Sequence, residues 1–262
     1  MVRPTKKRKS KLLFIILGFL VIIIGLISIF LKSGFFNIKY TEILGNNLIC
    51  ADKDQITSSI DVQGQSLLFL DRNKVSNNIL KKFICIKSAS VLQIFPDKVK
   101  VELVGRIPDA MLFTLKNSEA TTAGLLEEIA TPSAKAGMDA YLMDQEGVVF
   151  AKTSERLDIP NVFLDEDIMP GKKLDGNRGE KIFKVLVKIR EFGLDNTTSQ
   201  IYNNFLIVFS LPKIIFNLNE DINAQIASLQ LILKIAKIDH INLEFIDLRF
   251  DKPIVKFAPQ KK

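Results

Sequence analysis

Few residues in this chain combine the type and the spacing that enzyme chemistry requires. The 262 residues include one histidine, His240, and two cysteines, Cys50 and Cys85. A histidine acts as a general base beside a Ser or Cys nucleophile, and no recognisable motif supplies one here, which favours a surface or capping role for His240. The two cysteines lie 35 residues apart and lack the C-x-x-C spacing of zinc and redox sites.

Two acidic clusters could in principle hold a metal ion, Asp165-Glu166-Asp167 and Glu127-Glu128. Adjacent carboxylates in a loop do not converge on one point, so solvated loop charge is the favoured interpretation of both clusters. The chain also lacks the phosphate-binding pattern G-x-x-x-x-G-K-[ST] and the nucleophile pattern G-x-S-x-G. We therefore expect no enzyme activity, no metal ion, no cofactor and no small-molecule substrate.

The formal net charge of +7 comes almost entirely from the first eleven residues. This segment holds six Lys and Arg side chains, and no acidic residue precedes Glu42. The remainder of the chain has 30 Lys and Arg against 29 acidic residues. A nucleic-acid interface would give an excess of cations in the folded part, so we expect no nucleic-acid partner.

Residues 12–31, LLFIILGFLVIIIGLISIFL, form an uncharged apolar segment of 20 residues. A helix of this length spans about 30 Å, which matches the hydrocarbon core of a bilayer. A cleaved signal peptide would have a shorter apolar run and a small-residue cleavage site, and the following KSGFF offers none. We predict a transmembrane helix retained in the lipid bilayer. By the positive-inside rule, residues 1–11 form a basic cytoplasmic tail and the rest of the chain is extracytoplasmic.

The predicted compartment bears on the two cysteines. Outside the cytoplasm, Cys50 and Cys85 can form a disulfide if the fold brings them together, and the sequence does not give that distance. Cys85 belongs to an apolar, strand-like run, which favours a buried free thiol. The free thiol is the expected state.

Residues 35–108 have the pattern of a small module with the order β-α-α-β-β. The alternation in 36–40 predicts a strand that leads to the turn Gly45-Asn46-Asn47. Two further strands are expected between 84 and 103, on either side of the turn pair Pro96-Asp97. A small sheet with two helices on one face is the simplest arrangement of these elements.

Two short helices are predicted between the first and second strands of this module. Asp52 and Gln55 have the spacing of a capping box, which places the start of the first helix at Asp52. Asp71 is the expected N-cap of the second helix, whose apolar residues share one face.

Residues 109–257 predict a larger, mixed β domain of antiparallel strands with flanking helices. A strand over 110–115 precedes a stretch rich in Ser, Thr, Ala, Gly and Pro at 116–140. This stretch is interpreted as a flexible insertion, because so long a loop is unusual in a compact domain. A hairpin follows over 141–150, with its turn at 145–147.

The remaining elements of this domain alternate between helices and strands. Hydrophobic periodicity and turn residues predict, in chain order, a helix over 177–192, strands over 200–210 and 213–218, a helix capped by Asn219, strands over 241–250 and 254–257, and a short basic tail over 258–262. The expected fold class is therefore α+β after the N-terminal transmembrane helix.

Three sequence motifs resemble those of the FtsQ/DivIB family of bacterial cell-division proteins. The first runs from F-N-I at residue 36 through G-Q-S-L-L-F-L-D to I-F-P-D-K-V-K-V-E-L-V-G-R-I-P-D-A, and is similar to the POTRA domain of that family. The second, Y-L-M-D-Q-E-G-V-V-F at 141–150, and the third, F-I-D-L-R-F-D at 245–251, resemble elements of the family's β domain. Asp52 stands where family members often carry Ser, and Gly105 where Glu is usual; we assign neither departure a functional consequence.

The resemblance implies a non-enzymatic, single-pass scaffold of the bacterial division machinery, the divisome, located at the division septum. It places a POTRA domain over 35–108 and an FtsQ/DivIB-type β domain over 109–257. It also implies membrane-anchored partners, FtsB and FtsL, with the last strands of the β domain accepting a strand of FtsB. The alternative function is a POTRA-containing component of polypeptide secretion or envelope assembly.

The last predicted strand, 254–257, is expected at an open edge of its sheet, where a partner strand can add through main-chain hydrogen bonds. The candidate partner-binding residues of this strand are Ile254, Val255, Lys256 and Phe257, and the resemblance adds Arg249 and Phe250, which its third motif places beside this surface. Arg249 can pair with a partner carboxylate, or internally with Asp247 or Asp251. Phe250 is either an apolar anchor for a partner or part of the core.

Overall fold

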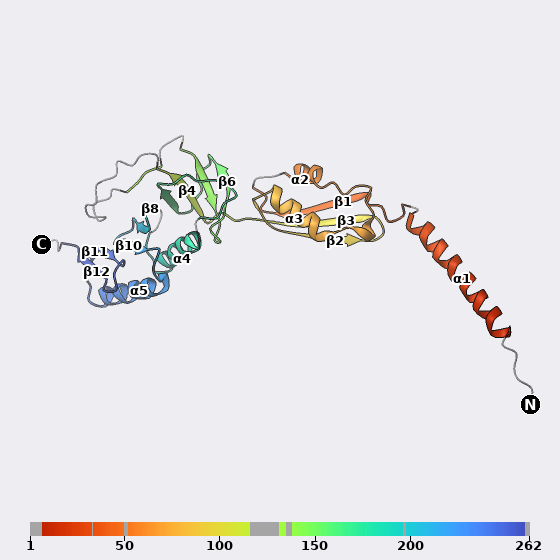
Figure 1. The fold of residues 1–262 in the computed structure, drawn as a ribbon. Coiled ribbons are helices and arrows are strands. Elements are labelled where there is room, and N and C mark those ends of the chain that lie inside the picture. Colours follow the sequence, from red (N-terminus) through yellow and green to blue (C-terminus); the bar gives the residue numbers. More distant parts are fainter. Residues whose placement is uncertain are drawn as a thin grey trace, which may run out of the picture. The chain divides into compact units, whose positions relative to one another are not determined.

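The computed structural model describes residues 7–32, 34–49, 52–115, 131–134, 138–174, 176–195 and 198–259. The chain divides into two compact units, Met1–Gly105 and Arg106–Lys262 (Figure 1). The N-terminal helix α1 spans Lys7–Lys32 in the first unit. Within the described residues, we find no helix whose length and apolar character suffice to cross a membrane.

After α1, the first unit has the predicted order of strands and helices. Its elements are β1 (Tyr40–Asn46), α2 (Lys53–Ser59), the 3-10 helix η1 (Leu67–Phe69), α3 (Arg72–Lys82), β2 (Ile86–Ile94) and β3 (Lys98–Gly105). The central strand of the three-stranded sheet is β3, which is parallel to β1 and antiparallel to β2. Its alternate residues Val99, Val101 and Leu103 are buried, together with Ile56 of α2 and Ile79 of α3. The β-α-α-β-β arrangement is confirmed.

The start of this unit differs from the prediction. The first strand is Tyr40–Asn46, so it starts four residues after the predicted start at Phe36 and runs through Gly45 instead of ending there. Residues 36–38 bond to a different segment: the Leu67 amide donates to the Phe36 carbonyl at 2.7 Å, and Asn37 forms a bridge with Ser66. The apolar alternation in 36–40 therefore reflects packing beside η1 rather than a place in the sheet.

One of the two predicted helix caps is present. The Asp71 carboxylate accepts the Lys74 amide at 3.0 Å and caps α3. Asp52 is the N-cap residue of α2, which confirms the predicted helix start, but it makes no side-chain cap hydrogen bond, so the capping box itself does not form. The buried Ile56 is what ties α2 to the sheet.

Cys85 is disulfide-bonded, which corrects the expectation of a free thiol. Cys50, the other cysteine of the chain, lies outside the described residues. Cys85 is buried, as expected. Burial in an apolar run suits a thiol and a disulfide equally, so the sequence pattern could not tell the two states apart.

The second unit is built on one nine-stranded sheet with the order β12-β11-β10-β9-β8-β7-β4-β5-β6. The strands are β4 (Ala110–Thr114), β5 (Ala140–Met143), β6 (Val149–Thr153), β7 (Asn161–Leu164), β8 (Thr198–Tyr202), β9 (Phe205–Val208), β10 (Lys213–Asn217), β11 (Leu243–Asp247) and β12 (Ile254–Phe257). The helices are α4 (Arg178–Glu191) and α5 (Ile222–Ile238). The predicted hairpin at 141–150 is present as β5 and β6.

The predicted mixed β domain is present, but three pairs of its strands are parallel, whereas antiparallel strands were expected. The pairs β4–β7, β7–β8 and β10–β11 are parallel. The chain passes through α4 between β7 and β8, and through α5 between β10 and β11. A helical crossover returns the chain in the same direction, so each of these helices produces a parallel pair.

The main core lies between the sheet and the two helices. Ile182, Leu186 and Ile189 of α4 are buried, and α5 contributes Ile222 and Leu229 to the same cluster. The N-cap of α5 is Asp221, which accepts the Asn223 amide at 2.8 Å, and not the predicted Asn219. Asp221 is two residues further along the chain and has the same capping chemistry.

The strand predicted over 200–210 is a hairpin of two strands, β8 and β9. The break falls at Asn203-Asn204, where Asn203 has a φ of 55°. Asn tolerates this left-handed backbone, which two-residue hairpin turns require. The predicted insertion at 116–140 falls mostly outside the described residues, since 116–130 and 135–137 are not among them.

Candidate functional site

Strand β12 lies at one edge of the nine-stranded sheet and pairs only with β11. In the described part of the chain, no residue forms a ladder or bridge on its outer side. The opposite edge differs, because Val148 bridges Lys173 and the Val149 amide donates to the Lys172 carbonyl at 3.1 Å. The free edge of this sheet is therefore the one that holds Ile254–Phe257.

The main-chain direction along β12 follows from one hydrogen bond beyond its end. The Ala258 amide donates to the Asn242 carbonyl at 2.9 Å, so it points toward β11. Antiparallel ladders alternate, which directs the main-chain groups of Lys256 and Ile254 toward β11 and those of Val255 and Phe257 away from it. The outward groups are the donors and acceptors that a partner strand would use.

The side chains of β12 divide between the two faces of the sheet. Val255 is partly buried and packs on the main core, opposite Ile246 of β11. Ile254 and Phe257 are more than half exposed. Lys256 pairs with Glu244 of β11, with its Nζ 3.4 Å from Oε1. Val255 thus holds the strand to its own domain, and Ile254 and Phe257 present apolar surface beside the open edge.

Arg249 makes an internal ion pair, one of the two arrangements that the sequence allowed. Its Nε lies 2.9 Å and its Nη2 2.6 Å from the two carboxylate oxygens of Asp247, which is 3% exposed. The Arg249 amide also donates to Asp247 Oδ1 at 3.0 Å. The guanidinium contacts the rings of Phe205 and Phe250, at 5.1 and 5.3 Å from their centroids. Arg249 therefore fixes the segment that leads from β11 to β12.

Phe250 belongs to the surface and not to the core. Its ring is 53% exposed, and Arg249 lies against it. Because Asp247 pairs in register with Ile254, the residues from 248 to 253 form a short connection at the end of the open edge. The sequence predicted the edge and its neighbours, but gave no sign that Phe205 of β9 supports Arg249.

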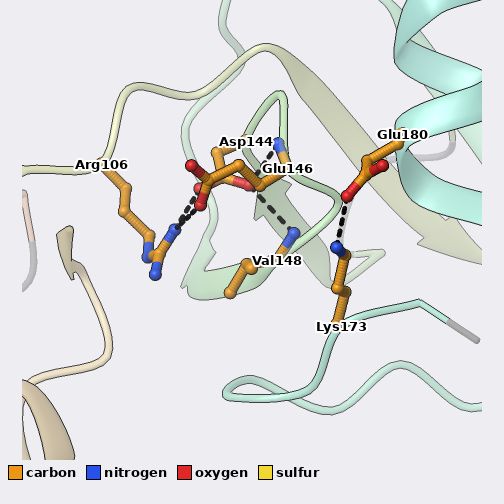
Figure 2. A network of polar contacts seen from close by, with 6 residues as sticks. All are labelled: Arg106, Asp144, Glu146, Val148, Lys173 and Glu180. Atoms are coloured by element: carbon orange, nitrogen blue, oxygen red, sulfur yellow. Dashed lines mark hydrogen bonds and ion pairs between the residues drawn. The ribbon is translucent and has the colours of Figure 1, made fainter. Parts of the chain in front are cut away.

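A second polar centre holds the first residue of this unit (Figure 2). The buried Asp144 carboxylate accepts a hydrogen bond from Arg106 Nη1, and its Oδ1 accepts the amides of Glu146 at 3.0 Å and Val148 at 2.9 Å. Arg106 Nη1 also lies 3.2 Å from a carboxylate oxygen of Glu146. The turn between β5 and β6 therefore anchors the start of the second unit.

No role was predicted for Gly105-Arg106, and the structure gives both residues one. A Cβ built on Gly105 would lie 1.8 Å from the Asn47 carbonyl oxygen, so a Glu at this position would clash with the turn after β1. The signal was present in the sequence as a glycine at the end of a strand. Arg106 carried no comparable signal, because its partner Asp144 is 38 residues away.

The residues whose types could have supported catalysis or metal binding have structural roles where the structure describes them. His240 follows the last turn of α5 with a φ of 52°, a position typical of helix ends. Glu166 pairs with Arg178 Nη1 at 3.1 Å. Across the described segments, no three His, Cys, Asp or Glu side chains gather in a way that could hold a metal ion. Glu127-Glu128 lies outside them.

Comparison with known families adds one finding. Residues 36–106 match the family model described as the FtsQ-type POTRA domain. The match covers the three-stranded sheet of the first unit with α2, η1 and α3, and bears out the resemblance to the FtsQ/DivIB family seen in the first motif. No curated protein shows significant similarity to the chain.

Proposed function

We propose that this chain, which carries an FtsQ-type POTRA domain, is a non-enzymatic, membrane-anchored scaffold of the bacterial division machinery. The observation that carries the proposal is the family match over residues 36–106. The two other motifs, at 141–150 and 245–251, lie in the second unit in the order that the FtsQ/DivIB family has. The role is to bring other division proteins together at the septum.

The proposed anchor is the apolar segment at 12–31, with the basic tail in the cytoplasm and residues 32–262 on the other side. The support is the uncharged length of 20 residues and the six cations that precede it. The disulfide of Cys85 favours the same topology, since disulfides persist mainly in oxidising compartments outside the cytoplasm.

The proposed mode of binding is strand addition to β12. Its outward main-chain groups at Val255 and Phe257 would give affinity, and exposed Ile254, Phe257 and Phe250 would contact the partner's side chains. By the resemblance, the partner strand belongs to a membrane-anchored protein like FtsB, accompanied by one like FtsL. Arg249 would act by holding Phe250 and the connection to β12 in place.

A fluorescent fusion at the N-terminus tests the role, since that end is proposed to be cytoplasmic. A divisome scaffold gathers at midcell in dividing cells and co-purifies with FtsB- and FtsL-like proteins from detergent-solubilised membranes. An even distribution around the envelope, with components of secretion in the purified complex, would instead favour the alternative of an envelope-assembly factor.

The anchor has a separate test. Replacing Ile22, Ile23 and Ile24 together with Arg places three charges near the middle of the apolar segment, and each charge costs about 2.5–3.5 kcal/mol in membrane insertion. We expect the wild-type chain to stay in the membrane fraction at alkaline pH and the variant to be released. Release of both proteins would argue against an anchor at 12–31 while leaving the strand-addition mode intact.

A further inference from the structure

We propose that the first unit rests on the bilayer surface through a patch of exposed apolar side chains at the end where the chain enters it. This inference rests on the proposed membrane anchor at 12–31. The patch, called here the anchor-proximal patch, consists of Phe35, Tyr40, Leu68, Phe69, Ile94 and Phe95, with exposed fractions between 38% and 80%.

Three chain segments meet at this end of the unit. The Leu67 amide donates to the Phe36 carbonyl at 2.7 Å, which holds η1 beside the entering chain. The amides of Lys39 and Tyr40 both donate to the Asp97 carbonyl, at 2.9 and 3.3 Å, which holds the β2–β3 turn beside the start of β1. The starts of β1 and β3 and the end of β2 therefore lie at one end of the sheet (Figure 1).

The apolar side chains at this end are continuous. The Phe36 ring packs edge-on against Phe35 at 5.2 Å and against Phe95 at 6.1 Å between centroids. Tyr40 and Ile94 flank Lys98 on either side in the sheet register. The carbonyl of Leu67 accepts from Gln93 Nε2 at 2.7 Å, which brings η1 to the strand that leads to Ile94 and Phe95.

The length of the connection identifies the occupant of this patch. Phe35 follows Leu31, the last residue of the proposed anchor, by four residues, and four extended residues reach at most about 14 Å. The headgroup layer on each side of a bilayer is roughly 5–8 Å thick. A patch tied to Phe35 and Phe36 therefore cannot leave the neighbourhood of the membrane. Clustered aromatic and Leu side chains favour burial at that interface, about 5–10 Å into the boundary between headgroups and acyl chains.

Tryptophan fluorescence offers a direct test, because the chain contains no Trp. Phe95→Trp and Phe69→Trp each place a single fluorophore in the anchor-proximal patch, at positions exposed enough to accept the larger ring. Val104→Trp is the matched control: it is also exposed and lies six residues beyond Lys98 on β3, about 20 Å along the strand. Phe19→Trp reports on the anchor itself.

The full-length variants are reconstituted into phosphatidylcholine vesicles whose acyl chains carry bromine either near the carbonyl end or near the methyl end. For Phe95→Trp and Phe69→Trp, we expect the emission maximum to lie at a shorter wavelength than that of the control Val104→Trp. We also expect this emission to be quenched most by the bromines near the carbonyl end of the acyl chains. The emission of Val104→Trp should be unchanged by the vesicles. Phe19→Trp should be quenched in both lipids.

Two results would overturn the inference, and they have different meanings. If the tryptophans at 95 and 69 behave like the one at 104 while the one at 19 is quenched, the anchor stands and the patch does not touch lipid. If the tryptophan at 19 is also unaffected by bromine, the proposed anchor fails, and the membrane contact fails with it.

Discussion

Gly147, in the turn between β5 and β6, packs backbone against backbone on Gly179, in the first turn of α4. A Cβ built on Gly179 would lie 2.4 Å from the Cα of Gly147, and one built on Gly147 would lie 2.7 Å from the Cα of Gly179. The Leu174 amide donates to the Gly147 carbonyl at 3.0 Å, and Lys173 pairs with Glu180 of α4 (Figure 2). The turn that anchors Arg106 is therefore itself held against a helix.

This contact reverses the usual effect of removing a glycine from a helix. Gly→Ala in an open helix interior stabilises by about 1 kcal/mol. For Gly179→Ala we expect a loss of about 1–3 kcal/mol, because the new methyl group forces two backbones apart. Urea denaturation of a fragment spanning residues 32–262 measures the free energy of unfolding. A variant as stable as the parent would mean that the turn and helix separate without cost.

The Asp247–Arg249 pair is predicted to stabilise the connection to β12. Arg249→Ala leaves the buried Asp247 carboxylate without its charged partner, and we expect a loss of about 1–3 kcal/mol in the free energy of unfolding. Arg249→Lys should recover only part of this, because an ammonium cannot match the two-pronged geometry of the guanidinium.

The matched control is Lys256→Ala on the neighbouring strand. Its pair with Glu244 is exposed on both sides, and such pairs contribute about 0–1 kcal/mol. Equal losses for Arg249→Ala and Lys256→Ala would show that burial of Asp247 does not strengthen its pair. The role of Arg249 as a support for β12 would then lose its physical basis.

The two aspartates at the starts of α2 and α3 give a second matched comparison. Asp71 accepts the Lys74 amide, whereas Asp52 makes no side-chain cap hydrogen bond. Asp71→Ala should therefore cost about 1 kcal/mol in the stability of the first unit, as is typical of a lost N-cap. Asp52→Ala should leave the unfolding midpoint within error of the parent. A larger loss at Asp52 would reveal a cap that forms in solution.

Glu42 on β1 pairs with Lys98 on β3 across the exposed face of the small sheet. The hydrogen bond from Lys98, assisted by its charge, lowers the pKa of the Glu42 carboxyl below its ordinary value. The pair therefore contributes to stability above the unfolded-state pKa, and this contribution is lost as the pH falls through the folded-state pKa. NMR titration of the Glu42 side chain should show its pKa rising in Lys98→Met. An unchanged titration curve would mean that the pair does not persist in solution.

Local patterns in the sequence predicted much of this fold because the interactions involved are local. The period of two in Val99, Val101 and Leu103 follows from one face of β3 being buried, and the spacing of Ile182, Leu186 and Ile189 follows from one face of α4. The turn at Pro96-Asp97 and the cap at Asp71 involve residues at most three positions apart. Each of these features can be recognised from the types and spacing of a few neighbouring residues.

Features that depend on distant residues were missed. Ion pairing of Arg106 with Asp144 joins residues 38 positions apart, and the contact of Arg249 with Phe205 joins the connection after β11 to β9, which is distant in the sequence. The parallel pairing of β10 with β11 depends on how α5 crosses the sheet, which hydrophobic spacing does not encode. At Asn203-Asn204 a local turn signal was present, but the continuous apolar run around it concealed the break between β8 and β9.

The open edge of β12 leads to the most specific prediction about partner binding. Val255→Pro removes a main-chain N–H that points away from β11, and Pro is tolerated on edge strands when that N–H faces solvent. We expect the variant to lose about 1 kcal/mol of stability, because Pro replaces part of the Val255 packing on the core, and to lose the capture of an FtsB-like partner. Lys256→Pro is the matched control, since its N–H points toward β11 and its loss removes a ladder hydrogen bond, which should destabilise the domain.

Circular dichroism melts of residues 32–262 measure the stability of both variants, and co-purification from membranes measures partner capture. If Val255→Pro unfolds as readily as Lys256→Pro, the assigned direction of the main-chain groups is wrong. If it loses only this much stability and keeps partner capture, the partner binds elsewhere than the edge of β12.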